Sequence, residues 1–122
     1  MIHCFIIDDE MPAIKIIKRY IDRLPDLQFV GAETNPVKGI EIIKREKPDI
    51  VFLDLEMTEM NGIEVVKQIG EEIKEILCSA YSESAVAGYD LKAMAYLTKP
   101  IEFHRFIEAL KPVLDSNRLS ND

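Results

Sequence analysis

The sequence contains no hydrophobic run long enough to cross a membrane. A transmembrane helix needs about 20 apolar residues, and the apolar stretches of this chain are much shorter. Its amino terminus also lacks the basic start, the long apolar region and the small-residue cleavage site of a signal peptide. We therefore expect a cytoplasmic protein that makes no membrane contact.

Basic residues are outnumbered, which argues against direct contact with nucleic acid. The chain has 15 Lys and Arg residues against 22 Asp and Glu residues, and its net charge is −7. Binding to a phosphate backbone depends on clustered Lys and Arg. We therefore expect this chain to make no direct nucleic acid contact.

Cysteine and histidine are scarce, with two residues of each type. Cys4 and Cys78 both lie in apolar runs, so we expect two buried thiols that behave as small hydrophobic side chains. A zinc-type site would need more Cys or His at ligand spacing. We expect His3 and His104 to be structural.

The 122 residues are enough for one compact domain and alternate between strand-like and helix-like patterns. Apolar runs predict strands at residues 2–7, 27–32, 50–53, 73–78 and 93–97. Apolar residues at helical spacing, together with Pro12, Asn35 and Pro36 as start signals, predict helices at residues 12–24, 63–69, 82–91 and 103–114, and a further helix that begins at Pro36, carries Ile43 and ends before Pro48.

Such alternation predicts an α/β fold in which right-handed crossovers build a parallel sheet covered by helices on both faces. Residues 1–115 form the predicted domain. Residues 116–122 are polar and carry no hydrophobic pattern. We expect them to be a frayed tail or the start of a linker to an output domain that lies outside the sequence.

Side chains suited to chemistry follow four of the predicted strands. Asp8 and Asp9 follow the first strand, Asp54 the third, Ser79 the fourth and Lys99 the fifth. The carboxyl ends of parallel strands meet at one edge of the sheet, where ligands of such folds bind. The sequence therefore predicts that carboxylates, a hydroxyl and an ammonium group gather there.

Two ionised carboxylates about 4 Å apart repel each other by roughly 4 kcal/mol at an effective dielectric of 20. Asp9 and Asp54 can share this edge at low energetic cost only if a divalent cation lies between them, and ligands that are all oxygen suit Mg²⁺. A carboxylate beside such an ion can act as a nucleophile. Lys99 and Ser79 would then bind the oxygens of an incoming phosphoryl group.

Four segments, in this order, resemble the response regulator receiver domain of two-component signalling. They are Asp8-Asp9, residues 54–62 (Asp-Leu-Glu-Met-Thr-Glu-Met-Asn-Gly), residues 78–81 (Cys-Ser-Ala-Tyr) and residues 96–100 (Tyr-Leu-Thr-Lys-Pro). The resemblance covers essentially the whole chain and implies a flavodoxin-like (CheY-like) doubly wound fold. That fold has a five-stranded parallel sheet of order 2-1-3-4-5 and five helices. The Leu-Asp-Leu-Glu-Met and Ser-Ala-Tyr runs look most like receivers of LytTR-type regulators.

The resemblance implies a phosphoacceptor and a Mg²⁺ site. Asp54 would take a phosphoryl group from a histidine kinase. Asp9 would bind Mg²⁺ directly together with Asp54, and Asp8 would help, partly through water. The backbone carbonyl of Glu56 would supply a further metal ligand.

The resemblance also implies a switch. Ser79 and Lys99 would contact the phosphoryl group, and Lys99–Pro100 would be a cis peptide. Tyr96 matches the aromatic residue that swings inward when Ser79 moves, although a static buried aromatic remains an alternative. The output surface would comprise helix 82–91, strand 93–97 and the last helix. It would control a DNA-binding domain or form a homodimer.

One position departs from the family pattern. Thr58 stands where the family usually has Pro, which would make the loop more mobile or shift the Mg²⁺ affinity and the lifetime of the phosphate. Glu56 and Tyr81 lie where the family tunes dephosphorylation, because their side chains control the access of water to the acyl phosphate. None of the matched chemical residues is lost.

Two other functions remain open. A pseudo-receiver would use the fold only for protein contact and would show no Mg²⁺ binding that depends on Asp9. A phosphohydrolase of the haloacid-dehalogenase type would also use a strand-end Asp. However, Glu56 replaces the second Asp of that motif, and Asp54 closes the third strand and not the first. The leading hypothesis is a signalling module that is no conventional enzyme, although it would catalyse its own phosphotransfer and slow hydrolysis.

Overall fold

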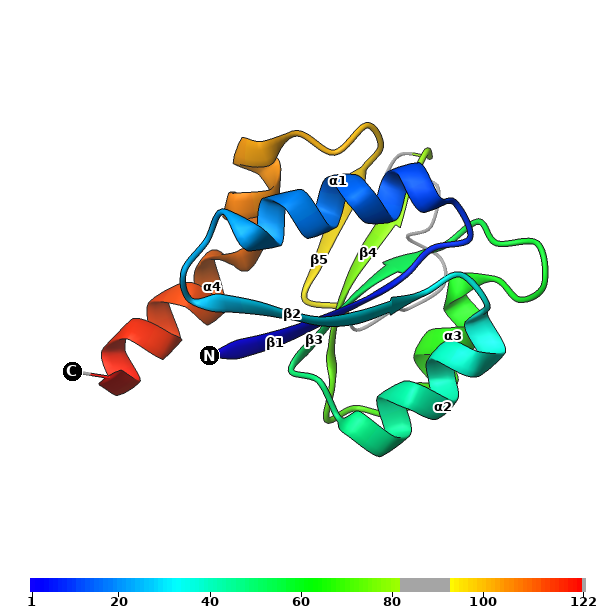
Figure 1. Ribbon diagram of the computed structural model, residues 1–122, viewed down its shortest axis with the longest axis horizontal. Helices are drawn as coiled ribbons and strands as arrows, with labels where there is room; N and C mark the ends of the chain where they lie inside the picture. The colour runs from blue at the N-terminus through cyan, green and yellow to red at the C-terminus, as the bar shows by residue number, and fades with distance from the viewer. Residues whose placement is uncertain (82–92, 122) are drawn as a thin grey trace.

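The computed structural model describes residues 1–81 and 93–121, with side chains described through residue 116. Five parallel strands form one sheet in the order β2-β1-β3-β4-β5 (Figure 1). The elements are β1 (Ile2–Ile7), α1 (Met11–Asp22), β2 (Leu27–Glu33), α2 (Pro36–Glu46), β3 (Ile50–Asp54), α3 (Gly62–Ile69), β4 (Lys74–Ser79), β5 (Ala95–Thr98) and α4 (Phe103–Asn121). The predicted fold class and strand order are confirmed.

The strands are buried on both faces because their side chains alternate between two cores. Cys4 and Ile6 of β1 point into the core beneath α1 and α4, whereas Phe5 and Ile7 point into the core beneath α2 and α3. Figure 1 shows the two pairs of helices on opposite sides of the sheet. The sheet therefore supports a rigid edge on which side chains can be placed.

Both thiols are buried, as the apolar runs predict. Cys4 and Cys78 form no disulfide and are less than 2% exposed. Burial raises the pKa of Cys4 to about 12 and raises that of Cys78 as well. Both therefore remain protonated thiols and behave as core side chains.

The helix α2 begins at the cap and proline that the sequence predicts. Pro36 occupies the first turn of α2, and the side chain of Asn35 accepts hydrogen bonds from the N–H groups of Val37 and Lys38. Asn61 caps α3 in the same way, by accepting from the N–H of Glu64 at 3.0 Å. These caps satisfy N–H groups that would otherwise lack a partner.

Two expectations concern the carboxyl-terminal half of the chain. The predicted helix 82–91 lies outside the described residues, so the last helix is α4 in Figure 1. The backbone of α4 continues as a helix through Asn121, and the role of residues 116–122 as a tail or the start of a linker stays a prediction. This segment has no Gly or Pro to end a helix that is already formed.

Boundaries shift by one or two residues elsewhere, and β5 begins at Ala95 where the sequence predicted residue 93. Among the described residues, none of the helices combines the length and the apolar character that a membrane span requires.

Candidate functional site

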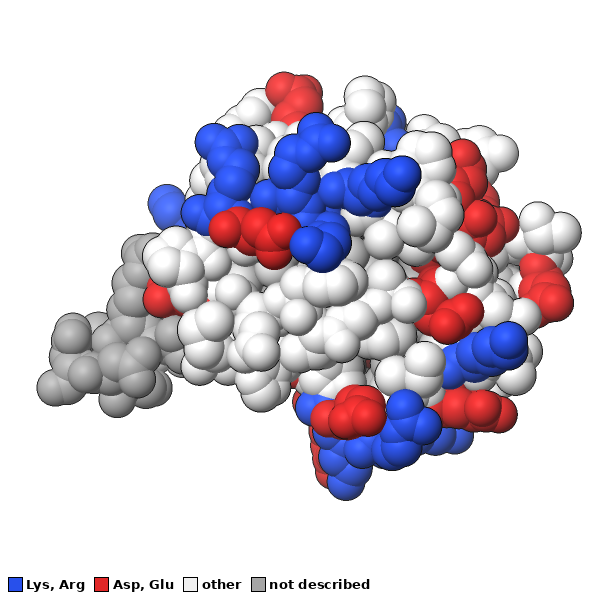
Figure 2. All heavy atoms as spheres, in the orientation of Figure 1, with Lys and Arg blue, Asp and Glu red and all other residues white. Residues whose placement is uncertain are grey.

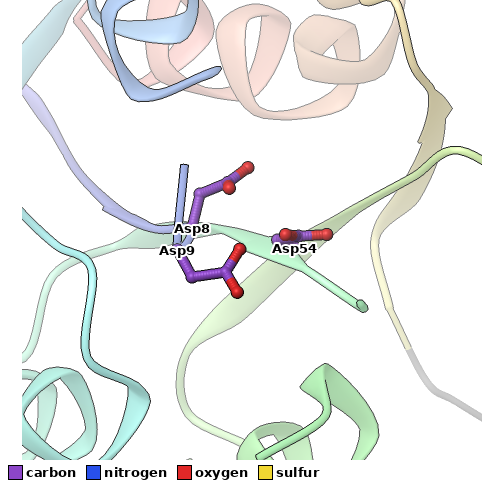
Figure 3. Close-up of side chains that lie close together, drawn as sticks. All are labelled: Asp8, Asp9 and Asp54. Carbon is purple, nitrogen blue, oxygen red and sulfur yellow. The ribbon is translucent and has the colours of Figure 1, made fainter. Parts of the chain in front are cut away.

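Three carboxylates meet at the carboxyl edge of the sheet. Asp8 and Asp9 directly follow β1, Asp54 ends β3, and the two strands are neighbours with Ile7 opposite Leu53. One oxygen from each of the three carboxylates lies within 4.8 Å of the other two. Figure 3 shows these side chains lying together. The predicted gathering of acids is confirmed.

The surroundings of Asp54 strongly raise the pKa of its carboxyl group. The side chains of Asp8 and Asp54 are 1% and 2% exposed. Burial, and then the charge of Asp8, raise the pKa of Asp54 to about 7, although the Glu56 N–H and Lys99 act in the opposite direction. That N–H donates to Asp54 Oδ1 at 3.0 Å. An ionised Asp54 is therefore costly unless more positive charge is present.

Lys99 supplies part of this charge from the end of β5. Its ammonium nitrogen lies 3.0 Å from Asp8 Oδ2 and 3.4 Å from Asp54 Oδ1. Burial lowers the pKa of Lys99, but hydrogen bonds and charges from Asp8 and Asp54 outweigh burial and raise it overall. The group is therefore a permanent cation, yet one ammonium cannot balance three carboxylates.

The remaining negative charge is what a divalent cation would neutralise. All three groups offer hard carboxylate oxygens, the ligand type that Mg²⁺ prefers, and the buried pair Asp8 and Asp54 gains most from a positive ion. The residues present therefore fit a Mg²⁺ site. The backbone carbonyl of Glu56 as a further ligand stays a prediction.

The side chain of Glu56 crosses to the end of β4. Ser79 Oγ donates to Glu56 Oε2 at 2.5 Å, and the N–H of Ala80 donates to Glu56 Oε1 at 2.9 Å. Ser79 Oγ in turn accepts from the N–H of Tyr81 at 3.0 Å. Sequence reasoning missed these contacts, and no local signal marks them because 23 residues separate Glu56 from Ser79.

Thr58 is bound to Asp9. Its backbone N–H donates to Asp9 Oδ2 at 3.2 Å, and its hydroxyl lies 3.4 Å from the same oxygen. A proline at this position could make neither contact, since it has no N–H and no hydroxyl. Thr58 therefore connects the loop after β3 to one of the three clustered carboxylates.

The predicted switch residues Ser79 and Tyr96 both form hydrogen bonds with the backbone of Tyr81. Tyr96 is partly buried, and its hydroxyl donates to the backbone carbonyl of Tyr81 at 2.9 Å. The Tyr81 side chain is 62% exposed. The Lys99–Pro100 peptide is cis, as the resemblance implied. The roles of these residues in switching and dephosphorylation stay predictions.

The two histidines lie outside this group. Both are exposed, and His104 lies 3.6 Å from the carboxylate of Glu102 in the first turns of the last helix. Figure 2 shows Lys and Arg side chains gathered over α1, with acidic side chains spread toward the side on which the strands end. The net negative charge is therefore unevenly distributed over this face.

Comparisons with known proteins agree with this geometry. Residues 4–111 match the family model of the response regulator receiver domain. An uncharacterized response regulatory protein of Shewanella oneidensis is 33% identical over 115 residues, which are 93% of this chain and 49% of the relative. The chain thus spans about half the length of that curated relative.

Solved structures share the fold. The response regulator domain of Thermotoga maritima CheB is 27% identical with a TM-score of 0.77, over 100% of this chain and 98% of that one. A two-component response regulator of the LuxR family from Aurantimonas sp. SI85-9A1 is 22% identical with a TM-score of 0.83. That match covers 93% of this chain and 85% of the other.

Proposed function

The chain belongs to the response regulator receiver domain family, and we propose that it is a phosphorylation-switched receiver whose phosphoacceptor is Asp54. The single observation that carries this proposal is the set of Asp8, Asp9, Asp54 and Lys99 at one edge of the sheet. This set places the buried carboxylate of Asp54, the proposed nucleophile, beside the Lys99 ammonium and beside carboxylates that suit a Mg²⁺ ion.

In the proposed reaction a carboxylate oxygen of Asp54 attacks the phosphorus of a phosphohistidine on a partner kinase. The new O–P bond forms as the P–N bond breaks, and the imidazole leaves with the bonding electron pair and takes up a proton from water. Mg²⁺, when bound, would supply positive charge that neutralises the carboxylates and the phosphoryl oxygens.

The protein's own residues do the rest of the proposed work. Lys99, already 3.4 Å from Asp54 Oδ1, would pair with a phosphoryl oxygen. The Ser79 hydroxyl would donate to another oxygen from the neighbouring strand. Asp9 and Asp8 would hold the cation with Asp54, since their oxygens lie together.

The proposed output is a change in the surface that includes β5 and α4; segment 82–91, which the resemblance adds to this surface, lies outside the described residues. Tyr96 is the proposed sensor on this surface. A DNA-binding domain, in the manner of LytTR-type regulators, is the proposed output, and a homodimer through the same surface is the alternative. The proposed location is cytoplasmic, with no membrane or nucleic acid contact by this domain itself.

The test is phosphorylation with Mg²⁺ and acetyl phosphate, followed by mass spectrometry of the intact protein. We expect one phosphoryl mass increment, absent without Mg²⁺ and absent in Asp54→Asn. Asp22→Asn is the matched control, because Asp22 is an exposed aspartate at the last position of α1 and is not one of the proposed site residues. The proposal would be contradicted by the absence of a phosphoryl mass increment in the unmodified protein, or by an increment that persists in Asp54→Asn.

A further inference from the structure

We propose that Glu56 is an internal stand-in for the phosphoryl group: in the unphosphorylated protein its carboxylate occupies the donors of Ser79 and Ala80. Phosphorylation of Asp54 then requires that this carboxylate leave. We call the two hydrogen bonds of Glu56 with Ser79 and Ala80 the Glu56 latch. The inference rests on the proposed function, because that function assigns the Ser79 hydroxyl to a phosphoryl oxygen; the Ala80 N–H is added here as the neighbouring donor that the same carboxylate occupies.

The geometry of the latch is that of an anion site. Each carboxylate oxygen takes one donor, Ser79 Oγ at 2.5 Å and the Ala80 N–H at 2.9 Å. These are charge-assisted hydrogen bonds, which are shorter and stronger than neutral ones. Two oxygens on one central atom are also what a phosphoryl group would offer to the same donors.

The donors stand at the end of β4, the strand that pairs with the one that Asp54 ends. Asp54 is directly opposite Cys78 in the β3–β4 pairing, so Ser79 is the next residue beyond that pair. Lys99 follows β5, the strand on the opposite side of β4 from β3, and its backbone N–H donates to the Ser79 carbonyl at 2.7 Å. The latch therefore closes over the same edge that holds the nucleophile.

The competition is exclusive because each donor has one hydrogen. A serine hydroxyl has a single O–H and a backbone amide a single N–H. The Ser79 oxygen also already accepts from the N–H of Tyr81 at 3.0 Å. Ser79 therefore cannot donate to Glu56 and to a phosphoryl oxygen at the same time.

Charge and exposure favour exchange after phosphorylation. A phosphoryl group brings a charge of about −1.5 to −2, which repels the Glu56 carboxylate. The ion pairs found for Lys99 among the described residues run to Asp8 and Asp54 and not to Glu56. Glu56 is an exposed residue, so its carboxylate can return to water with little desolvation penalty.

Release of the latch would reach the surface through Tyr81. The backbone of Tyr81 donates its N–H to Ser79 Oγ and accepts at its carbonyl from the Tyr96 hydroxyl. A shift of the Ser79 hydroxyl from Glu56 toward the phosphoryl group therefore displaces the backbone of Tyr81, to which the Tyr96 hydroxyl is hydrogen-bonded. The latch thus favours the unphosphorylated arrangement of both side chains.

The direct test follows the Ala80 amide by NMR in the metal-free, unphosphorylated protein. Glu56→Ala should shift its resonance and speed its hydrogen exchange, whereas Glu59→Gln, a change at an exposed acid of the same loop, should do neither. Glu56→Gln keeps the size but removes the charge and should give an intermediate result. An unchanged Ala80 amide in Glu56→Ala would overturn the latch.

The functional test measures the affinity for beryllium fluoride with Mg²⁺, a stable analogue of the phosphoryl group. Glu56→Ala should bind about tenfold more tightly than the unmodified protein and Glu59→Gln, since a charged hydrogen bond no longer competes. Equal affinities in all three would overturn the latch and leave the proposed function standing. No binding by any variant, with no phosphorylation of Asp54, would overturn the proposed function itself.

Discussion

Thr58 and Asp9 are joined across 49 residues of sequence by a backbone hydrogen bond of 3.2 Å from the Thr58 N–H to Asp9 Oδ2. The Thr58 hydroxyl approaches the same oxygen at 3.4 Å. The departure from proline at this position therefore adds a contact to a proposed metal ligand.

This contact predicts that Thr58→Pro weakens Mg²⁺ binding. Hydrogen bonds that orient a metal ligand typically change the metal affinity by 10-fold or more, so we expect the Mg²⁺ affinity to fall about tenfold. Isothermal titration calorimetry measures it directly. Thr58→Ser keeps both donors and should bind like the unmodified protein, and an equal or higher affinity in Thr58→Pro would contradict the prediction.

Removal of Lys99 should destabilise the metal-free protein. Lys99→Ala leaves Asp8 and Asp54 buried without the ammonium that now contacts both. Breaking a buried pair costs several kcal/mol, so we expect the free energy of unfolding to fall by about 3 kcal/mol at pH 8 in urea denaturation. Adding Asp54→Asn should recover part of this loss.

Lys18→Ala is the control for that comparison. Its ion pair with Asp22 is exposed, and such pairs contribute roughly 0–1 kcal/mol. If both lysine variants lose the same stability, the Lys99 pairs do not act as buried ones.

Gly62 should not tolerate a side chain. A Cβ there would lie 2.6 Å from the Asp54 carbonyl oxygen and 2.8 Å from Leu55 Cα, which are backbone atoms that cannot easily move. We expect Gly62→Ala to lower the free energy of unfolding by about 2 kcal/mol and to slow the phosphorylation of Asp54. Thermal unfolding and the mass assay measure both effects.

Gly39→Ala is the matched variant, because its nearest contact would be the flexible end of Ile7 at 2.6 Å. It should cost less, since Ala also has the higher helix propensity. Equal losses at both positions would show that backbone contact at Gly62 is not the cause.

Glu75 should make stability fall as the pH rises. It is 4% exposed, and burial raises its pKa from 4.5 to about 7. Between these values the folded protein binds a proton that the unfolded chain has released, so the stabilisation present below pH 4.5 is lost as the pH rises through 7.

Glu75→Gln should remove this dependence. We expect it to raise the free energy of unfolding on the order of 2 kcal/mol at pH 8 and to change it little at pH 4. Denaturation at both pH values checks this. A variant that is no more stable than the unmodified protein at pH 8 would show that ionised Glu75 is already well solvated or paired.

The positions of the site residues could be predicted from local patterns. Apolar runs bounded by polar residues place Asp8, Asp54, Ser79 and Lys99 at strand ends, and parallel topology brings such ends to one edge. The structure confirms that gathering for the three carboxylates and Lys99. The Mg²⁺ and phosphoryl chemistry of these residues stays a proposal.

The contacts of the Glu56 side chain could not be predicted in this way. Glu56 is two residues from Asp54 in sequence, yet its side chain binds Ser79 and Ala80 of another strand end. The path of the loop after β3 decides this, and it depends on packing around Gly62 and on the Asn61 cap. Neither the hydrophobic periodicity nor the spacing of motif residues in the sequence predicts the path of this loop.

The sequence by itself determined which side chains stand at the edge of the sheet, because hydrophobic burial and strand alternation act on local patterns. Only the tertiary structure decided which donors those side chains engage. Thr58 holds Asp9, and Glu56 holds Ser79. Hydrogen bonds of this kind depend on where distant segments meet to within a fraction of an ångström, and that placement comes from the packing of the whole domain.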